Sequence, residues 1–90
     1  MGAVARRVVV HGRVQGVGFR YSVQARARSR GVSGWVANRS DGSVEALFEG
    51  EPDAVAALVD FSREGPRGAE VEDVEVAGQE PQGLAGFEVR

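Results

Sequence analysis

Apolar and polar residues alternate near the start of the chain, from Arg7 to Val14. Val8, Val10, Gly12 and Val14 alternate with Arg7, Val9, His11 and Arg13. This period of two predicts a first strand with one buried face. The segment 19–30 lacks glycine and proline and stops before Gly31, so it predicts a first helix with Gly31 as its C-terminal cap.

Two further strands are predicted at Val32 to Asn38 and Ser43 to Glu49. They are joined through Arg39-Ser40-Asp41-Gly42, where the Asp-Gly pair favours a hairpin turn. In the second of these strands the alternation divides the side chains between two faces: Val44, Ala46 and Phe48 on one, Glu45, Leu47 and Glu49 on the other.

A second helix is predicted to begin near Glu51-Pro52-Asp53 and to end at Gly65-Pro66. Its residues at helical spacing, expected to be buried, are Val55, Leu58, Val59 and Ser62. A fourth strand is expected around Val74 and Val76, and a short last one at Phe87 and Val89, after a loop from Gly78 to Gly86.

This order predicts an α+β protein with the ferredoxin-like βαββαβ arrangement: an antiparallel sheet with a short fifth C-terminal strand and two helices on one face. A chain of 90 residues fits a single domain over residues 1–90. The same fold serves enzymes, RNA binders and regulatory domains, so function has to be argued from the residues of a site.

Charge is distributed unevenly although the net charge is only −2. Residues 1–39 hold eight arginines and no acidic residue, whereas residues 40–90 hold thirteen acidic residues and three arginines. An anion site is therefore expected in the first half. The absence of cysteine excludes disulfides and a thiolate nucleophile, and one histidine leaves little for metal binding. No apolar run approaches a signal or membrane segment, so we expect a cytoplasmic monomer that does not bind a membrane.

The first chemical motif runs from Gly12 to Arg20, between the first strand and the first helix. Glycines allow the backbone to turn its amides inward, and the helix N-terminus adds partial positive charge. Arg20, in the first turn of the helix, offers two parallel donors to a tetrahedral oxyanion. These features describe a phosphate-binding loop, although a tight turn with an exposed arginine accounts for the same residues.

The second motif runs from Gly34 to Val44 and contains Asn38, the only asparagine of the chain. The end of the Val32 to Asn38 strand is expected to lie near the loop of the first motif, since the strands are neighbours in this fold. A neutral amide accepts from a water molecule and donates to a phosphoryl oxygen at once. The alternative is that Asn38 only starts the hairpin.

Together the two motifs resemble the signature motifs of the acylphosphatase family. The first reads Val10-x-Gly12-x-Val14-Gln15-Gly16-Val17-x-Phe19-Arg20, and the second reads Gly34-Trp35-Val36-Ala37-Asn38, three residues, Gly42-x-Val44, five residues and Gly50. The resemblance extends over essentially the whole chain, including the end at Phe87-Glu88-Val89-Arg90.

The resemblance implies an enzyme that hydrolyses small acyl phosphates to a carboxylate and inorganic phosphate, without a metal or a cofactor. It assigns phosphate binding to Arg20 and to the main-chain amides of Gln15, Gly16, Val17, Gly18, Phe19 and Arg20. It assigns the orientation of the attacking water to Asn38. A carboxylate leaves readily because its conjugate acid titrates near pH 4, so no general acid is needed.

Other reactive side chains have structural interpretations. His11 alternates with the buried valines and is expected on the open sheet face. Trp35 is expected to be a packing or sheet-face residue and not a platform for the substrate. Ser22 and Ser40 lack a positioned base. The acidic run from Glu70 to Glu75 lacks calcium-loop spacing and is typical of a solvated strand edge.

Three other functions remain open at this stage. An RNA-binding module shares the fold, but the strands where such modules carry aromatic residues contain Val8-Val9-Val10 and, in the other, Glu45 and Glu49. A relative of the acylphosphatase-like domain of hydrogenase maturation proteins would act on carbamoyl phosphate. A small-molecule regulatory module would bind a ligand without turning it over.

Overall fold

The computed structural model describes residues 2–90 and confirms the predicted order of elements. The elements are β1 (Val4–Arg13), α1 (Phe19–Ser29), β2 (Ser33–Asn38), β3 (Val44–Gly50), α2 (Pro52–Glu64), β4 (Glu70–Gln79) and β5 (Phe87–Val89). Helix α1 stops one residue before the predicted end, and Gly31, at φ +69°, takes the left-handed conformation that terminates helices.

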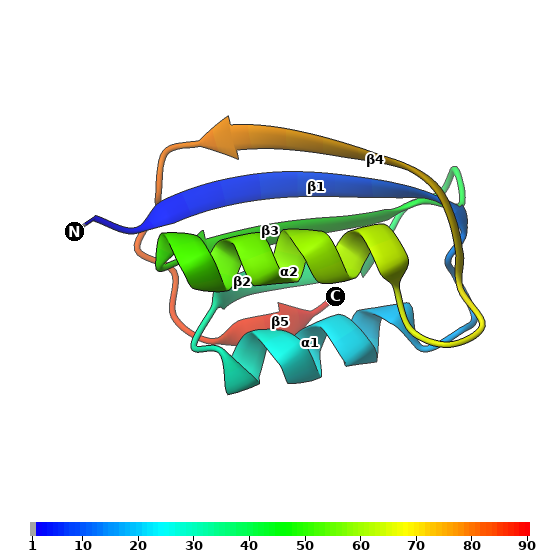
Figure 1. The fold of residues 1–90 in the computed structure, drawn as a ribbon, viewed down its shortest axis with the longest axis horizontal. Helices are drawn as coiled ribbons and strands as arrows, with labels where there is room; N and C mark the ends of the chain where they lie inside the picture. Colours follow the sequence, from blue (N-terminus) through cyan, green and yellow to red (C-terminus); the bar gives the residue numbers. More distant parts are fainter. Residues whose placement is uncertain (1) are drawn as a thin grey trace.

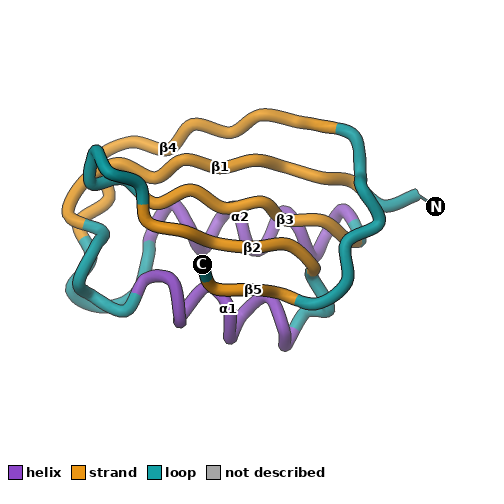
Figure 2. Tube along the Cα trace, turned by 180° about the vertical axis from the view of Figure 1, so that it is seen from behind, coloured by secondary structure: helices purple, strands orange, loops and turns teal. Residues whose placement is uncertain are grey.

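The five strands form one sheet in the order β4-β1-β3-β2-β5. Both helices cover one face (Figure 1), and the view from behind shows the other face free of helices (Figure 2). The pairs β1–β3, β1–β4 and β2–β3 are antiparallel, as predicted, whereas β5 pairs in parallel with β2 and makes the sheet mixed. The loop 80–86 joins β4, at one edge of the sheet, to β5, at the other edge. It stays at the end of the sheet where β4 stops, so β5 starts there and runs in the same direction as β2.

The hydrophobic core lies between the helices and the sheet face that they cover. The predicted inward residues Val44, Ala46 and Phe48 of β3 belong to it, and Val55, Leu58, Val59 and Ser62 of α2 are all buried. The helical and strand periods therefore identified the covered faces correctly. No helix within residues 2–90 is long and apolar enough to cross a membrane.

The sheet face opposite the helices is less exposed than its lack of helices suggests. Leu47 and Glu49 point away from the core, as predicted, yet both are buried. Leu47 lies between Arg7 and Trp35 in the strand register, and these long side chains flank it. His11 lies on the same face, as predicted, with its Nε2 2.6 Å from Glu75 Oε2.

Gly34 is a position where the fold tolerates only glycine. Its φ is +139°, and an added Cβ would overlap the main-chain oxygen of Leu47 on the neighbouring strand. We expect Gly34→Ala to lower the free energy of unfolding by about 3 kcal/mol or more, through backbone strain and overpacking. Urea denaturation measures the change. Gly78→Ala is the control, since Gly78 has no such φ and meets only the flexible end of Arg6, so a change within about 0.5 kcal/mol is expected there. Equal free energies of unfolding for the two variants would show that Gly34 tolerates a Cβ atom.

Candidate active site

The loop between β1 and α1 alternates between glycines of positive φ and residues without positive φ. Gly16 and Gly18 have φ of +75° and +76°, while Val17 and Phe19 between and after them do not have positive φ. An added Cβ at either glycine would meet nothing within 4 Å, so the backbone conformation, and not lack of space, requires glycine. Alternation of this kind points successive N–H groups toward one concave side and forms an anion-binding nest.

Helix α1 begins directly behind this loop without a side-chain cap. Gly18 is the N-cap residue and has no side chain to accept from the first-turn amides. Those amides therefore remain available to an external anion, and the positive end of the helix dipole points the same way. Phe19 contributes only its backbone here, because its ring is buried in the core beside Phe61.

Arg20 and Asn38 line one small cavity with the glycine loop. The cavity has a volume of about 110 Å³ and is lined by Val14, Gly16, Gly18, Phe19, Arg20, Tyr21 and Asn38. This space is large enough to admit a small polar group. The loop after β1 and the β2–β3 hairpin lie at the same end of the molecule in both views (Figures 1 and 2).

Gln15 joins the two motifs through its side chain. Its Nε2 donates to the main-chain oxygens of Arg39 at 2.8 Å and Ser43 at 3.0 Å. Gln15 and Val17 do not line the cavity, although both were predicted as phosphate-binding positions. The phosphate contact predicted for Gln15 concerns its main-chain amide, whereas its side chain holds the loop against the hairpin that carries Asn38.

The hairpin turn is stabilised by Asp41. Its Oδ1 accepts from the hydroxyl and from the main-chain amide of Ser43, and these bonds lower the pKa of the Asp41 carboxyl from its ordinary value. Ion pairing with Arg39 acts in the same direction. The turn is therefore held by a carboxylate that stays ionised at neutral pH, which fixes the hairpin next to Asn38.

The guanidinium of Arg20 is held in place by the last strand. Its Nη1 donates to the main-chain oxygen of Arg90 at 2.8 Å, and Arg90 N in turn donates to Val36 O on β2. A guanidinium carries five N–H donors, so one fixed contact leaves the others for a ligand in the cavity. Sequence reasoning missed Arg90, because the parallel pairing of β5 with β2 brings together residues that no local pattern connects.

Glu49 is a second residue that the sequence pattern did not identify. Its carboxylate is buried and accepts from the main-chain amides of Gln82 at 2.6 Å and Leu84 at 2.9 Å. These bonds anchor the irregular loop 80–86, which leads into β5. An acid on a strand beside a core residue was the available signal, but its partners lie more than thirty residues away.

The reactive side chains interpreted as structural from the sequence lie outside the cavity. His11 contacts Glu75, and Ser22 and Ser40 do not line it. Trp35 packs under the guanidinium of Arg90, 4.8 Å from its ring centre. Within residues 2–90, no group of three or more His, Cys, Asp or Glu side chains is placed to hold a metal ion.

Comparison with known proteins gives a consistent result. A family model described as Acylphosphatase matches residues 6–89. A protein of Thermococcus kodakarensis named Acylphosphatase is 51% identical over 89 residues, which cover 99% of this chain and 98% of the relative. The crystal structure of acylphosphatase from Bacillus subtilis superposes with a TM-score of 0.93 at 41% identity, covering 97% of this chain and 98% of that one. The chain also superposes on the crystal structure of full-length HypF with a TM-score of 0.90 at 29% identity, and the superposition covers 98% of this chain and 12% of that one.

The anchoring role of Glu49 is testable by stability. Glu49→Ala removes both acceptors and leaves two loop amides without partners, so we expect a loss of about 1–3 kcal/mol in the free energy of unfolding. Hydrogen exchange at Gln82 and Leu84 should accelerate more than exchange in β1. Glu80→Ala, in the same loop and exposed, serves as the control. Unchanged exchange at Gln82 and Leu84 would show that the loop is held by other contacts.

Proposed function

The chain belongs to the acylphosphatase family of hydrolases, and from that premise we propose how its residues divide the hydrolysis of an acyl phosphate between them. The main-chain amides of Gly16, Gly18, Phe19 and Arg20, which line the cavity, bind the phosphoryl group together with the Arg20 guanidinium. We include the amides of Gln15 and Val17 in the proposal because they belong to the same loop. Asn38 orients the attacking water. The described chain acts as one acylphosphatase-like domain, on small substrates and without a cofactor.

The observation that carries the proposal is the shared cavity of Arg20, Asn38 and the two left-handed glycines. Each feature alone has a structural explanation. Their occurrence in the lining of one cavity of about 110 Å³ supports the proposal, because main-chain amides, one cation and one neutral amide are the groups that phosphoryl binding needs. Donors that are already in position before reaction stabilise developing charge without reorganisation.

The reaction breaks one P–O bond and forms another. The water oxygen bonds to phosphorus while the bond from phosphorus to the acyl oxygen breaks, and its electron pair leaves with the carboxylate. The leaving carboxylate needs no protonation. The water loses its proton to a phosphoryl oxygen or to bulk water. The residues that line the cavity include no carboxylate and no imidazole to serve as a general base.

Metal independence belongs to the same proposal, because Arg20 and the loop amides supply the charge stabilisation that a metal ion would otherwise give. Direct attack by water fits a chain without cysteine, which has no thiolate to form a phosphorylated intermediate. We also propose that the protein works as a cytoplasmic monomer.

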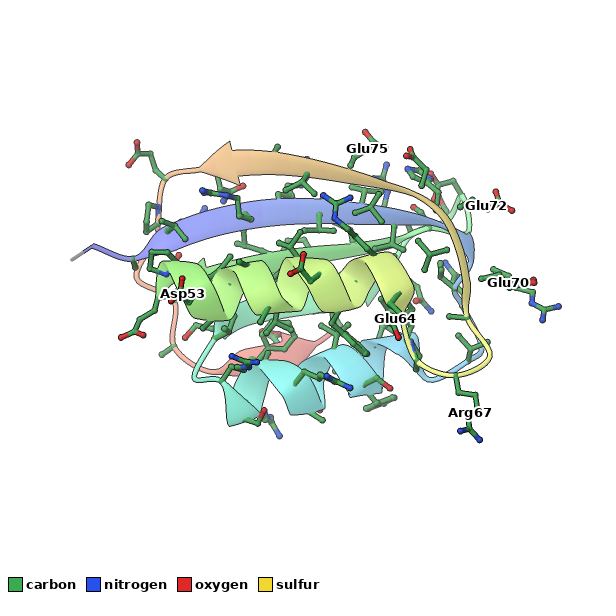
Figure 3. The ribbon with its side chains drawn as sticks, in the orientation of Figure 1. Asp53, Glu64, Arg67, Glu70, Glu72 and Glu75 are labelled. Carbon is green, nitrogen blue, oxygen red and sulfur yellow. The ribbon has the colours of Figure 1, made fainter. Side chains whose placement is uncertain are left out.

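We do not expect nucleic acid to be a partner. On the open sheet face Arg7 is paired with Glu45. The carboxylates of Glu70, Glu72 and Glu75 project along β4 at the sheet edge (Figure 3). A polyanion gains little from paired arginines and is repelled by an acidic edge. The RNA-binding alternative therefore has less support than the phosphate cavity.

Replacing Asn38 tests the role of the water. We expect Asn38→Ala to lower kcat for benzoyl phosphate about 10²- to 10³-fold, by loss of one positioned polar group. Inhibition by inorganic phosphate should change little, because the loop and Arg20 remain. Steady-state kinetics in EDTA measure both. Ser40→Ala, in the same hairpin, is the control and should keep wild-type turnover. Near-normal kcat in the Asn38 variant would remove the water-orienting role.

Replacing Arg20 by lysine tests the two-pronged clamp. Lysine keeps the charge, but its three donors diverge from a single nitrogen, so it cannot give phosphate two parallel donors while it also reaches Arg90 O. We expect Arg20→Lys to lower kcat/KM about 10- to 100-fold, as for the loss of a charged hydrogen bond. Wild-type kcat/KM and phosphate affinity in this variant would argue against the clamp.

A further inference from the structure

We call the small cavity lined by Arg20, Asn38 and the glycine loop the phosphate cavity. A second, larger cavity opens beside it, between α1 and β5. Its volume is about 570 Å³. Its walls come from α1 (Tyr21, Gln24 and Arg28), from β2 (Gly34 and Trp35), and from the segment 84–90. We call this space the α1–β5 groove. It contains neither Arg20 nor Asn38, so the residues proposed for phosphate chemistry do not account for it.

Among the described residues 2–90, Tyr21 alone lines both the groove and the phosphate cavity. It follows Arg20 directly on α1, and the Arg20 guanidinium lies 5.9 Å from the centre of its ring. The side chain is 64% exposed, and only Tyr21 and Val76 are large apolar side chains left exposed among residues 2–90. A large ring left in water at the rim of a phosphate site gains free energy when a ligand covers it.

The direction of the groove follows from helix geometry. Tyr21, Gln24 and Arg28 are spaced by three and four residues, so they share one face of α1 and lead away from the phosphate cavity. Asn38 lines the cavity but not the groove. In an in-line displacement the acyl oxygen leaves on the side opposite the attacking water. The groove begins at Tyr21 and does not include Asn38, so a leaving acyl group that lies in it is apart from the proposed water position.

The charges in the groove are already engaged with the protein. Arg28 Nη2 and Gln24 Nε2 both donate to Phe87 O at 3.3 Å. Arg90 lies over the Trp35 ring and 3.5 Å from Glu88 Oε1. What remains free at the end nearest the phosphate is the Tyr21 ring. This favours a flat apolar group over a second anion next to the reacting phosphoryl group.

We propose that the α1–β5 groove is the subsite for the acyl group, with Tyr21 as its platform, and that it favours acyl phosphates whose acyl group carries an aromatic ring next to the carbonyl. The inference rests on the proposed function, since it takes the phosphoryl group to lie between the glycine loop and Arg20. Tyr21 then determines specificity by covering the acyl group and takes no part in the chemistry.

The kinetic test compares benzoyl phosphate with acetyl phosphate, which share the phosphoryl group and differ in the ring. In Tyr21→Ala we expect the ratio of kcat/KM for benzoyl over acetyl phosphate to fall about three- to tenfold, the range of one ring-stacking contact, mostly through KM. Tyr21→Phe should retain the wild-type ratio. Arg26→Ala is the control, because it truncates a long exposed side chain of α1 that contacts Phe61 and lies outside the groove.

A binding test separates this inference from the proposed function. Benzylphosphonate and methylphosphonate are not hydrolysed, and their affinities are measured by chemical-shift titration of the wild type and of Tyr21→Ala. We expect benzylphosphonate to bind the wild type about three- to tenfold more tightly, and this preference to disappear in the variant. A protein that shows the preference but hydrolyses neither acyl phosphate would overturn the function and keep the subsite. An unchanged preference in Tyr21→Ala, or an equal loss for both ligands, would overturn the subsite.

Discussion

The antiparallel register of β1 and β3 determines where the site forms. Val10 lies opposite Val44 and Val4 opposite Gly50, so the chain leaves β1 at the same sheet end where the hairpin enters β3. The glycine loop follows the one and Asn38 precedes the other. A slip by one residue would turn the core valines of β1 to the open face. Burial of these valines against the helices therefore fixes the register, and the register fixes where the glycine loop and Asn38 lie.

The arginines of this protein divide into structural and chemical groups through their partners. Arg7 is paired with Glu45, Arg26 lies over Phe61, Arg28 donates to Phe87 O and Arg90 lies over Trp35. Each of these contacts is worth little at an exposed site, but together they engage the cations near the groove and on the sheet. Arg20 is the arginine among the residues lining the small cavity, and its hydrogen bond to Arg90 O orients it.

The last strand connects features that are far apart in the sequence. Glu49 anchors the loop before β5, and β5 forms one wall of the α1–β5 groove. Arg90, the residue after β5, supplies the oxygen that holds Arg20. A three-residue edge strand has little stability by itself, so its position depends on these contacts. The proposed phosphate site and the proposed acyl subsite therefore share a support that neither motif contains.

The sequence by itself determined the elements and their covered faces, because periodicity, glycine and proline act locally. It also identified the two motifs, because each is one continuous segment. In the first, the φ values at Gly16 and Gly18 and the spacing from the loop to Arg20 are local properties of that segment. Only the tertiary structure decided that Gln15 bonds to the hairpin, that β5 runs parallel to β2, and that Glu49 holds the loop 80–86. The same holds for the pairing of Tyr21 with a groove whose other wall is β5. Together with the bond from Arg20 to Arg90, these contacts join residues from 24 to 70 positions apart, and their geometry exists only after the sheet and helices have packed around the core.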